Sequence, residues 1–163
     1  MKAKLVAIAA EEARKNYYGE TLEQAGNLHP MEQLFVSERE LSHEELNADW
    51  SGAFAYHCLR LAGIELPLHY PDPRVGESFA SVRAWELYAH LPKIAIWNRG
   101  SCVEAGDLVF LKVPEGAPRL MGIILLVDGD RLEIAVGNYR NHSAIIERSI
   151  AESVRGIIKP ELL

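Results

Sequence analysis

The chain has 163 residues, of which 48% are hydrophobic and 25% are charged, values typical of a globular protein with a buried core. The formal net charge of −6 argues against a nucleic-acid partner, because phosphate binding requires clustered lysine and arginine. We therefore expect one domain over residues 1–163, made of an N-terminal helix and irregular segment (1–48), a helical half (49–98) and a sheet (103–160).

Helical periodicity dominates the first part of the chain. Residues 3–15 have the apolar spacing of an amphipathic helix. The segment 16–48 is less regular, but Ser42 and Glu45 have the spacing of a capping box, which predicts a short helix after Ser42. We expect this segment to hold little further regular structure.

Two more helices are expected before the sheet. Asp49 is a good N-cap residue, and Gly63 is a typical residue at a helix end, so a helix is predicted between them. After a proline-rich loop, residues 79–91 have a third helical pattern, and Pro92 is predicted to end it.

The pattern changes to short apolar segments in the last third of the chain. Asp128-Gly129-Asp130 is typical of a hairpin turn. Because helices precede strands, the fold class predicted is α+β, with N-terminal helices packed on a curled antiparallel meander of about five strands. The five expected strands are 108–113, 121–127, 132–136, 144–148 and 154–158.

No segment is long and apolar enough to span a membrane. The apolar run at residues 5–10 is too short for the core of a signal peptide, and Glu11 and Glu12 follow it directly. These features predict a cytoplasmic location. Export by a route that needs no signal peptide remains an alternative. Cys58 and Cys102 are too few for a disulfide framework, and we expect two free thiols.

The start of the helix after Asp49 is a chemically favourable place for a nucleophile. Unpaired N–H groups and the positive dipole end of a helix stabilise a thiolate there, and a histidine on a neighbouring strand then holds the proton. The run from Trp50 to Phe54, followed by Ala62-Gly63, resembles the nucleophile helix of the CHAP amidases, which reads Trp-Cys-x-x-Phe. That resemblance places Ser51 at the cysteine position.

A second register is suggested by the related NlpC/P60 pattern, Asp-Cys-Ser-Gly with a later tyrosine. This pattern is resembled by Asp49, Ser51, Gly52 and Tyr56. In this register Trp50 would stand at the cysteine position. The spacing to Phe54 and to the glycine that ends the helix favours Ser51.

Further motifs follow in the order that these families have. Ser81 and Trp85 resemble their Ser-x-x-x-Trp helix, and the run from Gly106 to Phe110 resembles the entry to their first strand. The triplet starting at Leu120 stands where those proteins have His-Val-Gly, and Gly137-Asn138 resembles their Gly-Gly-Asn. The resemblance covers residues 49–160.

The resemblance implies a papain-like fold of the CHAP and NlpC/P60 kind, the fold of cell-wall amidases and endopeptidases. It implies that Ser51, Leu120 and Asn138 hold the family's cysteine, histidine and asparagine positions, with the first two substituted. A binding groove would then include Trp50, Trp85, Tyr139 and His142, although the two tryptophans also suit a core. No cofactor and no metal site are expected.

The leading hypothesis is a pseudoenzyme that keeps a groove for a peptide, a glycan or a protein, such as a peptidoglycan stem peptide. One alternative is an active amidase or peptidase with a relocated pair, for example Ser51 with His142. Another is a structural component of a phage or secretion system. Nothing in the sequence sets the oligomeric state.

Overall fold

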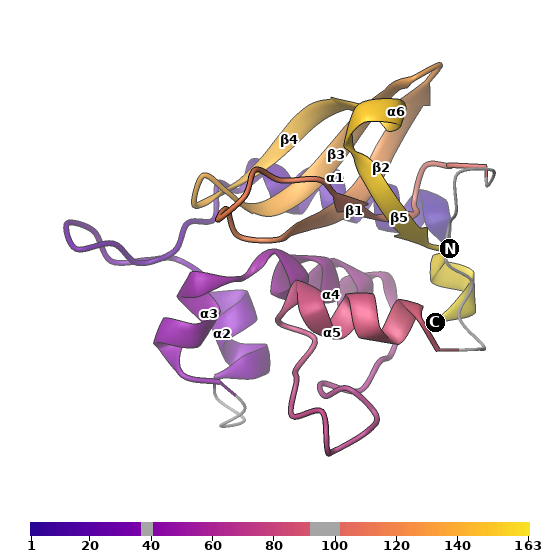
Figure 1. Ribbon diagram of the computed structural model, residues 1–163. Coiled ribbons are helices and arrows are strands. Elements are labelled where there is room, and N and C mark those ends of the chain that lie inside the picture. The colour runs from indigo at the N-terminus through magenta and orange to yellow at the C-terminus, as the bar shows by residue number, and fades with distance from the viewer. Residues whose placement is uncertain (37–40, 92–101) are drawn as a thin grey trace.

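The computed structural model describes residues 1–36, 41–91 and 102–163. A curled five-stranded antiparallel sheet, built by the C-terminal part of the chain, packs against the helices that precede it (Figure 1). The helices are α1 (Lys2–Arg14), α2 (His29–Phe35), α3 (His43–Ala48), α4 (Ser51–Ala62), α5 (Val82–Ala89), α6 (Ile150–Ser153) and the 3₁₀ helix η1 (Pro160–Leu162).

The sheet has the strand order β4-β3-β2-β1-β5, with every neighbouring pair antiparallel. The predicted α+β class and the five predicted strands are therefore confirmed. The strands are β1 (Leu108–Leu111), β2 (Leu120–Asp128), β3 (Arg131–Tyr139), β4 (His142–Ser149) and β5 (Val154–Ile158).

Several helix ends coincide with the residues that the sequence predicts for them. The capping box after Ser42 is present, since its hydroxyl accepts from the Glu45 amide and the Glu45 carboxylate accepts from the Ser42 amide. Gly63 ends α4 in the left-handed conformation with φ 89°. The predicted Asp49 cap is wrong, because Trp50 is the N-cap residue of α4 and makes no side-chain cap bond.

The third predicted helix is shorter than expected. It starts after Ser81, whose hydroxyl accepts a hydrogen bond from the Ala84 amide, and it ends at Ala89. Pro92, predicted as its end, lies outside the described residues. The sequence also gave no warning of α2, a seven-residue helix without a side-chain cap.

Both hairpins around β3 have two-residue turns. Asp128 pairs with Arg131 across the expected turn, where Gly129 has φ 59°. Tyr139 pairs with His142 across a second turn, where Arg140 and Asn141 have φ 52° and 65°. Two positive φ values are typical of a type I′ turn, which matches the twist of the flanking strands.

Two apolar clusters lie on opposite faces of the sheet. Leu108 and Phe110 join the cluster formed with α1, α2, α4 and α5, whereas the alternating residues Val109 and Leu111 join the cluster inside the curl. Cys58 lies in the first cluster as a fully buried free thiol, and burial raises its pKa. The sheet is thus packed on both faces.

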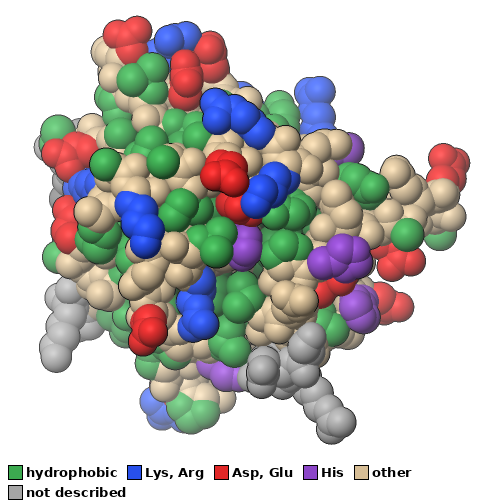
Figure 2. Space-filling view, turned by 180° about the vertical axis from the view of Figure 1, so that it is seen from behind, with side chains coloured by type: hydrophobic (Ala, Val, Ile, Leu, Met, Phe, Trp, Pro, Cys, Tyr) green, Lys and Arg blue, Asp and Glu red, His purple; other side chains and the backbone are tan. Residues whose placement is uncertain are grey.

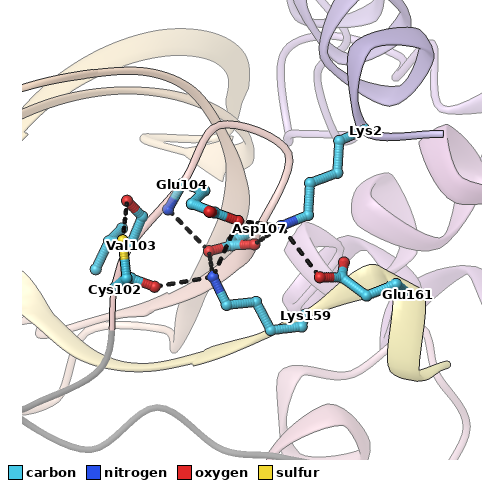
Figure 3. A network of polar contacts seen from close by, with 7 residues as sticks. All are labelled: Lys2, Cys102, Val103, Glu104, Asp107, Lys159 and Glu161. Carbon is cyan, nitrogen blue, oxygen red and sulfur yellow. Dashed lines mark hydrogen bonds and ion pairs between the residues drawn. The ribbon is translucent and has the colours of Figure 1, made fainter.

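A buried carboxylate ties both ends of the chain to the start of β1. Asp107 is fully buried and accepts hydrogen bonds from Lys2 Nζ at 2.9 Å and from Lys159 Nζ at 2.7 Å (Figure 3). The Glu104 amide binds the same carboxylate at 2.9 Å. Gly106 leaves room for Lys2, because a Cβ there would lie 2.8 Å from the Cβ of Lys2. The Gly-Asp motif before β1 therefore has a structural role.

The surface carries charges of both signs. Figure 2 shows acidic and basic side chains intermingled over the face seen from behind, with hydrophobic side chains between them. Within residues 1–36, 41–91 and 102–163, no helix is long and apolar enough to cross a bilayer.

Candidate functional site

Ser51 is the first residue of α4, where it faces the start of β2. Its hydroxyl donates to the Arg119 carbonyl at 3.4 Å and accepts from the Met121 amide at 3.4 Å. The side chain has no exposed surface. Among the described residues, no titratable side chain hydrogen-bonds to this hydroxyl. To act as a nucleophile, a serine needs a base beside its hydroxyl and must be accessible to the substrate. In this structure Ser51 has no such base among the described residues and is not accessible.

Leu120 lies between the two backbone groups that Ser51 contacts. The position that the resemblance assigns to histidine therefore adjoins the position that it assigns to cysteine. The Leu120 side chain belongs to the cluster inside the curl, however, and Met121 points to the α4 side instead. An aliphatic group at position 120 supplies no proton acceptor.

Asn138 follows a close contact between β3 and α4. Gly137 allows that contact, because a Cβ there would lie 2.4 Å from the Cβ of Phe54. Asn138 has φ 59°, at an irregularity in the pairing of β3 with β4. Its amide nitrogen is buried and has no hydrogen-bond partner among the described residues. Among the described residues, no histidine hydrogen-bonds to this side chain.

Asp49 carries an unusual carboxyl group next to Ser51. Burial raises its pKa to about 6, although the backbone N–H groups of Val82 and Ser51 bind the carboxylate and oppose that shift. One of its oxygens, Oδ1, is buried with no hydrogen-bond partner among the described residues. The carboxylate thus contacts the Ser51 amide, which cannot be activated as a nucleophile.

The raised pKa of Asp49 predicts a pH effect on stability. Between pH 4 and pH 7 the folded protein releases a proton that the unfolded chain has already lost, so stability falls as pH rises through about 6. Relative to Asp49→Asn, the wild type should lose about 2–3 kcal/mol of unfolding free energy over this range. Urea unfolding of both proteins at each pH measures the difference, and parallel pH profiles would contradict the assignment.

The two tryptophans expected in a groove are in the core. Trp50 and Trp85 are both fully buried, and the indole nitrogen of Trp85 donates to the Phe79 carbonyl at 2.9 Å. Neither side chain lines an open surface. This correction follows from the apolar cluster between the helices and the sheet, which encloses both rings.

His142 contacts residues other than Ser51. Its Nδ1 lies 3.0 Å from Asn16 Oδ1, and its ring centroid lies 5.9 Å from that of Tyr18. The hydrogen-bond partners of Ser51 are backbone groups of Arg119 and Met121. The structure therefore does not bring the relocated pair into hydrogen-bond contact.

An open pocket of about 610 Å³ lies beside Leu120 and Asn138. Its wall is formed by the end of α3, the loop 112–118, the start of β2 and the β3–β4 turn. Tyr139, predicted as a groove residue, is part of this wall, and His142 is not. The groove expected over Ser51 is closed, but a pocket remains next to it.

The rim of this pocket is fixed by asparagines. Asn141 Oδ1 accepts from the Gly19 amide at 3.1 Å, and its Nδ2 donates to the Gly19 carbonyl at 3.0 Å. Asn47 Oδ1 accepts from the Glu20 amide at 2.9 Å. These bonds attach the base of the protruding loop 19–27, at the left of Figure 1, to two residues of the pocket wall.

A second polar cluster lies away from the pocket, between α1 and α4. The buried Glu12 carboxylate binds Tyr17 Oη at 2.7 Å, His57 Nε2 at 3.0 Å and the Lys15 ammonium. These hydrogen bonds outweigh burial and lower the pKa of Glu12, whereas burial lowers the pKa of His57. The cluster compensates a buried charge and joins the two helices.

Comparison of the chain with protein-family models, with curated proteins and with solved structures finds no match. Among the described residues, no group of three or more histidine, cysteine or acidic side chains is arranged to hold a metal ion. The candidate site therefore rests on the geometry of Ser51, Leu120, Asn138 and the adjoining pocket.

Proposed function

We propose that this chain is a non-catalytic member of the papain-like CHAP and NlpC/P60 group that binds a ligand in the pocket beside Leu120. The sequence motifs that stand in the family's order over residues 49–160 support membership. The contact between the first turn of α4 and the start of β2 supports it as well, since the family's cysteine and histidine adjoin in that way.

One observation carries the non-catalytic part of the proposal. Ser51 is fully buried, and its hydroxyl is bound to two backbone groups. Leu120 replaces the base. General-base assistance alone is worth roughly 10²–10⁴ in rate, so losing both groups removes the amidase chemistry of the family.

The pocket beside Leu120 supports the proposal that the chain binds a ligand. Its volume of about 610 Å³ falls in the range of ordinary ligand sites, roughly 300–1,000 Å³. It is open, whereas a purely structural module would be expected to fill it with its own side chains. A peptide or glycan segment fits this size, and the resemblance favours a peptidoglycan stem peptide.

The non-catalytic proposal predicts that Ser51→Ala changes nothing in an amidase assay. Wild type and variant are incubated with peptidoglycan and with soluble stem peptides, and products are identified by mass spectrometry. We expect intact substrate in both reactions. Amide cleavage by the wild type that disappears in Ser51→Ala would overturn the proposal.

A further inference from the structure

We infer that the pocket beside Leu120 selects ligands that carry a free carboxylate, bound by Lys112, Arg140 and Arg148. This inference deepens the proposed function and rests on it. It names the chemistry that the pocket recognises.

The charge of the pocket is opposite to that of the whole protein. Its wall holds Lys112, Arg140 and Arg148 and no acidic side chain, although the chain has a formal net charge of −6. Like-signed charges around a concave surface concentrate the field and attract a ligand of opposite sign. The pocket is therefore complementary to an anion.

These three cations have no carboxylate partner among the described residues. Elsewhere many basic side chains are paired, as Lys2 and Lys159 are with Asp107. Arg148 instead donates to the Glu147 carbonyl at 2.7 Å. Donors of the three basic groups are thus left for a ligand, and charge-assisted hydrogen bonds are the strongest that a carboxylate accepts.

The Tyr139 ring contacts two of these cations. The guanidinium carbon of Arg140 lies 5.5 Å from the Tyr139 ring centroid, and that of Arg148 lies 5.3 Å from it. Cation–π contacts orient both guanidinium groups. Both groups are therefore positioned at the pocket before a ligand binds.

The backbone of Arg140 is in the left-handed conformation, which arginine rarely adopts. Arg140 has φ 52° in the β3–β4 turn, where asparagine or glycine is the usual residue. A long basic side chain at such a position favours a functional role for that side chain. Asparagine there would suit the turn better and would carry no charge.

Apolar groups complete the pocket. Leu120, Pro114 and Pro118 contribute to the wall beside the basic groups. A ligand with a small apolar group next to its carboxylate, as in a short peptide, matches both parts.

The test compares two probes of nearly the same shape, of which one carries carboxylates and the other carries neutral amides. One is the stem tripeptide L-Ala-γ-D-Glu-L-Lys, and the other is the same peptide with its carboxylates converted to amides. Binding of each is measured by titration calorimetry at low and at high salt. We expect the amide peptide to bind at least about tenfold more weakly, and the carboxylate peptide to lose affinity as salt rises.

Arg140→Asn separates binding from folding. The variant should bind the carboxylate peptide about tenfold more weakly, leave binding of the amide peptide unchanged, and keep its melting temperature because asparagine suits the turn. Arg83→Gln is the matched control, since it removes one exposed cation outside the pocket and should leave both affinities unchanged.

The outcomes distinguish this inference from the proposed function. Equal binding of both peptides, unaffected by Arg140→Asn, would overturn carboxylate selection and leave ligand binding intact. Failure of both peptides to bind would overturn the inference together with stem-peptide binding.

Discussion

Replacing Asp107 by alanine is expected to lower the free energy of unfolding by about 3–5 kcal/mol, the usual cost of breaking a buried ion pair. The carboxylate is fully buried and binds Lys2 and Lys159, which come from opposite ends of the chain. Its loss leaves the two ammonium groups with only more exposed carboxylates, such as that of Glu104, and frees both termini from β1. Urea unfolding followed by circular dichroism measures the change.

Glu104 provides the matched control for this substitution. It contacts the same two lysines at 2.6 and 3.4 Å, but its side chain is 54% exposed. Exposed ion pairs contribute little to stability because solvent screens them, so Glu104→Gln should have a much smaller effect than Asp107→Ala. Equal effects of the two substitutions would show that Asp107 is not the residue that ties the termini to the sheet.

Replacing Gly137 by alanine is expected to cost about 3 kcal/mol, at the upper end of what overpacking costs. The added Cβ would lie 2.4 Å from Phe54 Cβ and 2.9 Å from the Trp50 ring. The Cβ of a helical residue cannot move without the helix, so α4 and β3 must separate. Chemical denaturation gives the cost, and the NMR signal of the Trp50 indole N–H reports the displacement.

Gly129→Ala is the reference for that experiment. A Cβ at Gly129 meets no atom within 4 Å, so its cost of about 1–2 kcal/mol comes from the positive φ of 59°. It should leave the Trp50 signal in place. A Gly137→Ala protein with wild-type stability and an unshifted Trp50 signal would contradict the close packing of α4 on β3.

The fold was largely predictable because its signals are local. Alternating apolar residues, the turn at Gly129 and the glycine that ends α4 each act over a few positions, and each is present in the structure. The start of α4 was not predictable in the same way. Asp49 has the right chemistry for a cap, but tertiary packing directs its carboxylate to the Val82 amide at 3.4 Å.

The candidate site was predictable only in part. The sequence placed Ser51 at a helix start and predicted the strand that it contacts. The side to which Leu120 points was not predictable, because a shift of one residue in a strand reverses the face. The basic groups of the pocket were missed too, since only the curl of the sheet brings Arg148 to the ring of Tyr139.

Titration calorimetry of the wild-type protein with L-Ala-γ-D-Glu-L-Lys distinguishes ligand binding from hydrolysis, because one trace reports both binding and turnover. We expect a saturating isotherm with no sustained heat after each injection. A steady heat of hydrolysis that Ser51→Ala abolishes would contradict it.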